Sequence, residues 1–168
     1  MSSERAGDRL ASVTSDQFRH ACGRFATGVT IASVLDASGT PHGLTVNSFS
    51  SVSLDPPLIL ICLGHAVTNI EDFRAAGYFG LSVLAEQQRE LSDRFARKGH
   101  DRFNGTPWHP GGTGVPLLDG ALAEIECEAH HRFAVGDHDI LVGRMVAARV
   151  SEGEPLIYYA SRYRELSR

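Results

Sequence analysis

The spacing of hydrophobic residues changes from helical to strand-like near Gly28. Before this point, four residues recur at i, i+3, i+4 and i+7 behind N-cap candidates at 14–16: Phe18, Ala21, Cys22 and Phe25. This pattern predicts one amphipathic helix that ends near Gly28. After it, β-branched or alternating runs predict strands. These runs occupy residues 29–35, 43–48, 58–63, 78–84, 123–130, 140–150 and 156–159.

Two more helices and one long loop interrupt the predicted strands. Thr68 is expected to cap a short helix that carries Ile70 and Phe73, because Glu71 completes a capping box. Residues 86–97 predict a further helix. Residues 99–116 are rich in Gly and Pro and are expected to be irregular, a length of loop that is usually functional or mobile.

The order of these elements predicts a mainly β fold with short helices. Hairpin-type turns at 36–39 and 135–138 join neighbouring strands, which favours an antiparallel barrel with helical inserts. The apolar run at 58–63 predicts a strand buried on both faces. From residue 123 onward apolar residues alternate with Glu124, Glu126 and Glu128, so one face is apolar and the other acidic. One domain is expected at 14–168, after a loose tail at 1–13.

Charge and composition exclude several classes of protein. The chain of 168 residues carries a formal charge of −4 with no basic block, so we expect neither a nucleic-acid nor a membrane partner. The polar N-terminus lacks the apolar core of a signal peptide, which places the protein in the cytoplasm. The three cysteines of the chain are widely spaced and are expected to be buried free thiols.

Familiar catalytic motifs are absent. No GxGxxG motif opens a helix after a strand, no GxSxG elbow suggests a hydrolase, and no HExxH suggests zinc. His130 and His131 are adjacent in a predicted strand, so they should point to opposite faces and not share an ion. We therefore expect no metal.

The strongest candidate for chemistry is the polar segment at 45–51. Thr45, Asn47, Ser48, Ser50 and Ser51 stand among apolar neighbours where strand alternation ends. One interpretation is a polar edge strand that runs into a serine-rich turn. The other is a row of N–H, hydroxyl and amide groups that lines the edge of a planar ligand such as an isoalloxazine.

This segment, 43–57, resembles the short-chain flavin reductase family, whose members supply reduced flavin to two-component monooxygenases. The likeness covers about residues 15 to 166 and continues through further motifs in the same order. These motifs lie at 28–30, 58–62, 80–85, 101–103, 116–122, 136–138 and 162–163. The resemblance implies a split β-barrel, a homodimer, and a flavin held near the dimer interface.

The resemblance also assigns site residues. Those expected to bind FMN or FAD are Thr45, Val46, Asn47, Ser48, Phe49, Ser51, Val52, Ala66, Val67, Thr68, Phe73, Lys98 and Gly99. Those expected to meet the nicotinamide are His138, Arg162 and Tyr163. The helix start at Thr68 would favour a phosphate. Many relatives have a serine at or beside Ala66 or Val67. This chain has none, so backbone amides and Lys98 with Gly99 would carry the phosphate contacts, and FMN versus FAD stays open.

The function implied is NAD(P)H:flavin oxidoreduction, with a hydride passing from nicotinamide to flavin and reduced flavin passing to a separate monooxygenase. The cofactors supply the chemistry, so no catalytic acid or base is expected. No basic pocket for a 2′-phosphate is visible, which favours NADH over NADPH. Two alternatives remain: a flavin-binding electron carrier, and a split-barrel flavin-dependent oxidase or oxygenase.

Overall fold

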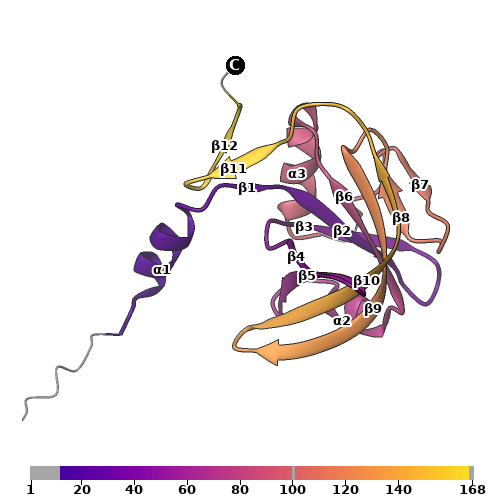
Figure 1. The fold of residues 1–168 in the computed structure, drawn as a ribbon, viewed down its shortest axis with the longest axis horizontal. Helices are drawn as coiled ribbons and strands as arrows, with labels where there is room; N and C mark the ends of the chain where they lie inside the picture. Colours follow the sequence, from indigo (N-terminus) through magenta and orange to yellow (C-terminus); the bar gives the residue numbers. More distant parts are fainter. Residues whose placement is uncertain (1–11, 100, 167–168) are drawn as a thin grey trace, which may run out of the picture.

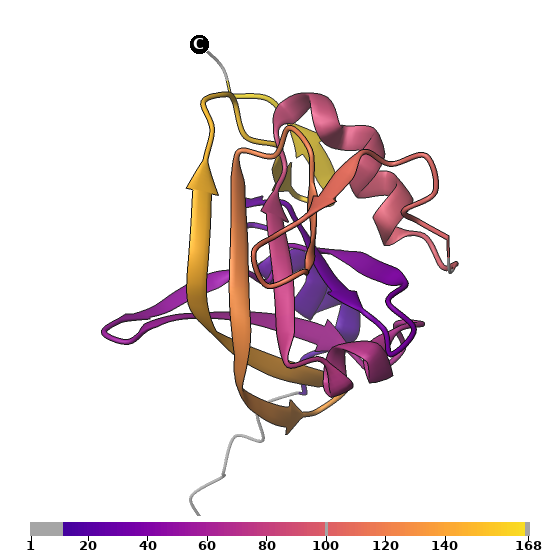
Figure 2. The same ribbon diagram turned by 90° about the vertical axis from the view of Figure 1, so that its right-hand side faces the viewer.

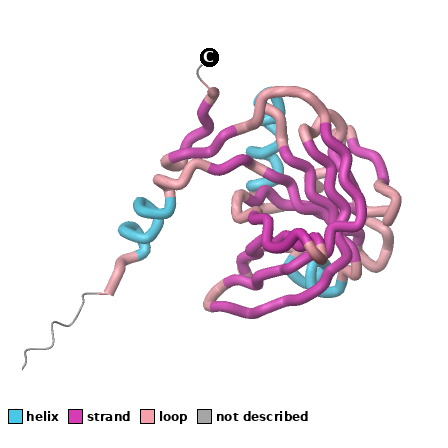
Figure 3. The backbone as a smooth tube through the Cα atoms, in the orientation of Figure 1, coloured by secondary structure: helices cyan, strands magenta, loops and turns pink. Residues whose placement is uncertain are grey.

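The fold is built on one strongly curved antiparallel sheet (Figures 1 and 3). The computed structural model describes residues 12–99 and 101–166, so nearly all of the predicted tail at 1–13 lies outside the described residues. Across the sheet the strands are β3 (Pro41–Val46), β2 (Thr30–Leu35), β6 (Tyr78–Val83), β9 (Ala123–Val135), β10 (His138–Val150), β5 (Pro57–Gly64) and β4 (Ser50–Leu54). The prediction of a mainly β fold is confirmed.

The sheet does not close into a complete barrel. Strands β3 and β4 are its two edges, and the described residues form no ladder between them. The barrel is therefore split, as the family resemblance implies. Residues 47–49 connect the two edge strands, so the chain leaves one edge and enters the other where the polar segment lies.

Two small sheets accompany the large one. In the first, β11 (Ile157–Tyr159) pairs with β1 (Thr27–Gly28) and with β12 (Arg162–Arg164). In the second, β7 (Trp108–Pro110) pairs with β8 (Pro116–Leu118) and lies beside the main sheet in Figure 2. The expectation that 99–116 is irregular throughout is therefore wrong, because Trp108 pairs with Leu118 and is partly buried against the core.

The helices are short. They are α1 (Ser15–Cys22), α2 (Ile70–Ala75), the 3-10 turn η1 (Glu86–Gln88) and α3 (Arg89–Ala96). The helix predicted at 86–97 is thus divided into a 3-10 turn and an α-helix. One core cluster fills the curved sheet beneath α2, with Phe73, Phe79 and Ile61 at most 1% exposed. A second lies under α3 and includes Phe95 and Phe103 in edge-to-face contact.

Helix α1 forms where expected, but it does not pack as expected. Thr14 caps it in a capping box with Gln17, and it ends at Cys22, well before Gly28. None of its residues is buried, and Phe18 is 62% exposed. The helix projects from the body of the molecule in Figure 1. The prediction that Cys22 is buried is wrong for the same reason, whereas Cys127 is buried and Cys62 is half-buried.

The start of α2 also differs from the prediction. Its N-cap is Asn69, not Thr68, and no side chain caps the helix. Thr68 lies one residue before the cap and is exposed. Asn69 instead turns its amide toward His42 and Asp72, at 3.1 Å from each. The capping pattern at Thr68 does not form, because the next residue, Asn69, binds His42, which is distant in sequence.

Three strand predictions need correction. β5 is buried on one face only, at Ile59, Ile61 and Leu63, because it lies next to the sheet edge. Glu124 and Glu126 on β9 are buried, not exposed on an acidic face, and Glu126 accepts hydrogen bonds from residues 112 and 113.

The third correction concerns the adjacent histidines of β9. Their rings are 4.4 Å apart in edge contact rather than on opposite faces. The cause lies in the register of the β9–β10 ladder. His131 pairs with Val142 and Ala129 with Gly143, so His130 is the extra residue of a bulge.

Candidate functional site

The link between β3 and β4 leaves backbone donors free. Asn47, Ser48 and Phe49 belong to no strand, and their N–H groups make no hydrogen bond within the described residues. Asn47 and Phe49 are exposed. Three consecutive free N–H groups at a sheet edge can bind the oxygen and nitrogen acceptors of a planar ligand.

The hydroxyl groups of this segment are used inside the protein. The Thr45 hydroxyl donates to the Ser92 carbonyl at 2.7 Å. The Ser48 hydroxyl accepts from the Cys62 N–H at 2.8 Å. The expectation that the Thr45 and Ser48 hydroxyls are directed at a ligand is therefore corrected. The Asn47 amide and the Ser51 hydroxyl make no hydrogen bond within the described residues, so they are the free polar side chains of the segment.

Asn47 lines a cavity of about 190 Å³ with residues from four other elements. The lining residues are Val29, Thr45, Asn47, Ser92, Ala96, Tyr158 and Tyr163. The two tyrosine rings meet edge to face at 5.4 Å. The Tyr163 hydroxyl is 2.8 Å from the Ser92 hydroxyl and donates to Asp93 at 3.0 Å, and burial raises the pKa of Tyr163. The predicted residues Thr45, Asn47 and Tyr163 are thus brought together.

A second cavity of about 270 Å³ adjoins Asn47 on the side of α1. It is lined by Phe18 and Phe25, by the β11–β12 turn, and by Thr27. The Thr27 hydroxyl oxygen is buried without a hydrogen-bond partner among the described residues. A buried orphan oxygen beside an exposed amide indicates a place where a polar ligand can bind.

Two predicted flavin residues are in the core. Phe73 is 1% exposed and Val46 is 5% exposed, both within the core cluster beneath α2. Their side chains pack against the protein, so the expected contact of these side chains with flavin is corrected. Ser51 and Val52 on β4 are exposed, as are Lys98 and Gly99 after α3.

The turn at 65–68 lies beside the hairpin that carries His138. Ala66 and Thr68 are exposed, while Val67 packs against the core. Gly64 pairs with His138 in the β5–β10 ladder, and a Cβ at Gly64 would lie 3.4 Å from the His138 Nε2. The histidine ring therefore sits over the backbone that leads into the turn.

The three residues predicted to meet nicotinamide are not brought together within one chain. His138 begins β10 at the turn of the long hairpin, whereas Arg162 and Tyr163 are in β12. Figures 1 and 2 show these at opposite ends of the molecule. Only Tyr163 joins the cavity that Asn47 lines.

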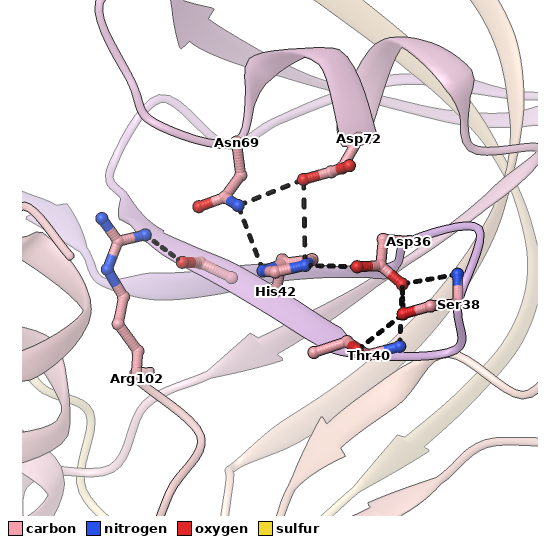
Figure 4. A network of polar contacts seen from close by, with 8 residues as sticks. Asp36, Ser38, Thr40, His42, Asn69, Asp72 and Arg102 are labelled. Carbon is pink, nitrogen blue, oxygen red and sulfur yellow. Dashed lines mark hydrogen bonds and ion pairs between the residues drawn. The ribbon is translucent and has the colours of Figure 1, made fainter. Parts of the chain in front are cut away.

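Sequence motifs give no sign of a partly buried polar network next to the site (Figure 4). The His42 Nε2 is 3.0 Å from Asp36, and its Nδ1 is 3.1 Å from Asn69. Hydrogen bonds from Ser38 and then from His42 hold the pKa of Asp36 far below its usual range. Arg102 donates to the Gly43 carbonyl at 2.5 Å, also drawn in Figure 4, and so fixes the segment after Lys98 to β3. These partners are distant in sequence and carry no local signal.

The described residues form neither a metal cluster nor a membrane-spanning helix. Among residues 12–99 and 101–166, no group of three or more His, Cys, Asp or Glu side chains is arranged to hold a metal. Within the same residues, no helix has the length and apolar character needed to cross a bilayer.

Comparison with known proteins identifies one family. Residues 22–167 match the family model of the flavin reductase like domain. The protein named "Probable flavin reductase" in Rhizobium meliloti (strain 1021) is 46% identical over 129 residues, which are 77% of this chain and 42% of that protein. The chain therefore spans less than half the length of that relative.

Two solved structures are similar over most of their length. The Streptomyces globisporus NADH:FAD oxidoreductase SgcE6, in complex with NAD and FAD fragments, has a TM-score of 0.86 and 36% identity, covering 90% of this chain and 92% of that one. BorF, the flavin reductase component of a bacterial two-component tryptophan halogenase, has a TM-score of 0.85 and 38% identity, covering 92% and 99%.

Proposed function

The chain belongs to the flavin reductase like domain family, and from this premise we propose that it transfers a hydride from NADH to a bound flavin. One observation carries the proposal. Asn47 lines two cavities at the open edge of the barrel, the orphan Thr27 hydroxyl belongs to the lining of one of them, and the free N–H groups at 47–49 continue along the same edge. That arrangement suits the acceptor-rich edge of an isoalloxazine.

The residues present fit a flavin in two respects. Tyr158 and Tyr163 offer aromatic surface next to the polar edge, as a ring ligand requires. The backbone donors are fixed, because the Ser48 hydroxyl holds the link to β5 on one side and the Thr45 hydroxyl holds β3 to α3 on the other. We place Phe49 along this edge and Ser51 and Val52 behind it. We place Ala66 to Thr68 with Lys98 and Gly99 toward the phosphate end.

Catalysis follows from position and electrostatics. Bound nicotinamide and flavin supply the hydride donor and acceptor, whose reacting atoms must lie about 3–3.5 Å apart. The N–H groups at 47–49 would hold the acceptor edge of the flavin ring and would favour negative charge there. His138 binds the nicotinamide from the hairpin side. No protein group needs to gain or lose a proton for the hydride to move.

The partners are part of the proposal. SgcE6 is named for NADH and FAD, and BorF is named as one component of a two-component enzyme. By analogy, this chain uses NADH to reduce FMN or FAD and gives the reduced flavin to a separate monooxygenase. Its setting is the cytoplasm, where the three free thiols suit a reducing compartment.

We place a second copy of the chain against α1, making a homodimer. Phe18 and Phe25 are 62% and 78% exposed, and both line the cavity that Asn47 shares. Each of the two cavities at Asn47 is smaller than the roughly 300–1,000 Å³ of a complete ligand pocket. A partner seated on the apolar face of α1 both covers the two phenylalanines and closes the flavin site.

Anaerobic mixing of the protein, flavin and NADH or NADPH tests the activity. We expect the flavin absorbance to bleach at least tenfold faster with NADH than in protein-free controls. No acceleration with either nucleotide, although the protein binds flavin, would support an electron carrier instead. Rapid oxidation of an organic substrate by this chain alone would support the oxidase or oxygenase.

A further inference from the structure

Asp139 is a buried carboxylate that is not among the residues expected to bind flavin or nicotinamide. It is 6% exposed and directly follows His138 in β10. Its Oδ1 is 2.8 Å from the His65 Nε2, and its Oδ2 accepts from the Arg74 Nε at 2.7 Å. The hydrogen bonds from Arg74 and then from His65 lower the pKa of Asp139 to about 2.

These contacts join the 65–68 turn, between β5 and α2, to the turn of the β9–β10 hairpin. His65 opens the 65–68 turn after β5, and its backbone N–H donates to the Asp137 carbonyl at 2.9 Å. Asp137 lies in the turn before β10, and its carboxylate accepts from the His138 Nδ1 at 2.7 Å. One side-chain link and one backbone link therefore fix His65 relative to His138.

Arg74 extends the same brace to α2. Its guanidinium also donates to Glu71 at 2.8 Å, within the helix. From β9, the Arg132 guanidinium donates to the carbonyls of Phe73, at 2.8 Å, and Ala76, at 3.0 Å. The C-terminal end of α2 is thus held to β9. The 65–68 turn, which precedes α2, is held to β10. The turn at 65–68 cannot shift without breaking charge-assisted bonds.

Asp139 also determines how the His65 ring is presented. An ionised carboxylate only accepts hydrogen bonds, so the His65 Nε2 carries the proton. The His65 side chain is 36% exposed, and its Nδ1 makes no hydrogen bond within the described residues. His65 is followed in the same turn by Ala66, which is exposed.

We propose that Asp139 is a positioning residue of the reductase site, acting through His65 and Arg74. This inference rests on the proposed function, which puts the flavin chain at 65–68 and the nicotinamide at His138. The Asp139 brace fixes these two segments at one separation, and so fixes the phosphate end of the flavin relative to the nicotinamide that donates the hydride. A displacement of about 1 Å at such a site can cost about 100-fold in rate.

The experiment compares Asp139→Asn and His65→Gln with a matched control, Glu128→Gln. Asn keeps the shape of the side chain but replaces one acceptor with a donor, which conflicts with Arg74 or forces the His65 proton to the other nitrogen. Gln at the half-exposed position 65 is compatible with folding. Glu128 forms an ion pair with Arg144 across the same strands β9 and β10, outside the site.

Anaerobic stopped-flow measurement with saturating NADH gives the transfer rate per bound flavin, and fluorescence titration gives the flavin Kd. We expect the rate to fall at least tenfold in Asp139→Asn and His65→Gln, with the flavin Kd changed less than about threefold. NADH deuterated at C4 should show an isotope effect at least as large as in the wild type, because the slowed step is the transfer itself.

The control decides between positioning and general stability. Glu128→Gln should leave the rate per bound flavin within twofold of the wild type. A fall of the same size in all three variants, or an unchanged rate in both site variants, overturns the proposal. A wild-type chain that binds flavin but bleaches it with neither nucleotide overturns the proposed function itself, and the positioning role with it.

Discussion

The Ser48 hydroxyl takes the place of a ladder hydrogen-bond pair between the β3–β4 link and β5. It accepts from the Cys62 backbone N–H at 2.8 Å and donates to the Cys62 carbonyl at 3.1 Å. Cys62 pairs with Ile140 on the other side of β5. A single side chain therefore satisfies both backbone groups of a residue at the open edge of the barrel, and it holds the flavin-binding link in place.

Ser48→Ala should therefore lower the stability of the fold and have little direct effect on the binding of flavin. Loss of the hydroxyl leaves the Cys62 N–H and carbonyl unsatisfied in a half-buried position, which costs about 1–2 kcal/mol. Urea unfolding should show a lower midpoint with an unchanged m-value. A flavin Kd that rises more than tenfold with no change in stability would contradict this assignment. It would indicate that the hydroxyl binds the flavin directly.

Asn47→Ala should have the opposite profile. The Asn47 amide makes no hydrogen bond within the described residues and lines both cavities at the site. Its loss should raise the flavin Kd about three- to tenfold, the equivalent of one hydrogen bond, without changing the unfolding free energy. Titration by flavin fluorescence measures this. Unchanged affinity and unchanged turnover would remove Asn47 from the site.

Sequence reasoning reached the parts of this fold that depend on local pattern. The strand periodicities and the 135–138 turn predicted the large sheet. The N-cap of the first helix is Thr14, one of the three candidates at 14–16, and its partner Gln17 is only three residues away. Side-chain packing was harder to predict from the sequence. Glu124 looked like a surface residue, and it is buried because β7 and β8 lie over that face, which alternation within β9 cannot reveal.

In the candidate site, too, the sequence predicted what depends on local pattern and not what depends on long-range contacts. The segment at 45–51 was found because polar residues interrupt an apolar pattern. The use of the Thr45 and Ser48 hydroxyls could not be foreseen, since Ser92 and Cys62 are 47 and 14 residues away. Nor could the role of Asp139, whose two partners lie 74 and 65 residues away. Contacts of that range leave no periodic signal.

Gly143→Ala should destabilise the barrel. Gly143 marks a bulge where β10 crosses the core, and a Cβ there would lie 2.4 Å from the Phe79 ring and 2.8 Å from the Cys127 Cβ. Phe79 is 1% exposed and cannot withdraw. Overpacking of this kind costs about 1–3 kcal/mol, measurable by urea unfolding. Gly77→Ala is the control, since nothing lies within 4 Å of a Cβ at that exposed position.

Asp139 should make stability depend on acid pH. Its pKa falls from the usual 3.8 to about 2 in the folded chain, first through Arg74 and then through His65. Between these values the unfolded chain binds the proton and the folded chain does not, so stability falls as the pH falls from about 4 to about 2. Asp139→Asn lacks this component. The difference in melting temperature between wild type and variant should therefore shrink over that window. A constant difference would show that the carboxylate is not selectively ionised in the folded state.

Replacing Phe18 and Phe25 together by Asp should separate the proposed dimer. Both rings are exposed in the single chain, so charges there cost little in the monomer but prevent burial against a second copy. Light scattering should shift from twice 18.2 kDa for the wild type to 18.2 kDa for the variant. Val150→Asp, also at an apolar residue 81% exposed but on β10, should remain dimeric. Because the partner is expected to close the cavities around Asn47, flavin affinity should fall together with the dimer. A monomeric variant that binds flavin as tightly as the wild type would show that one chain holds the complete site.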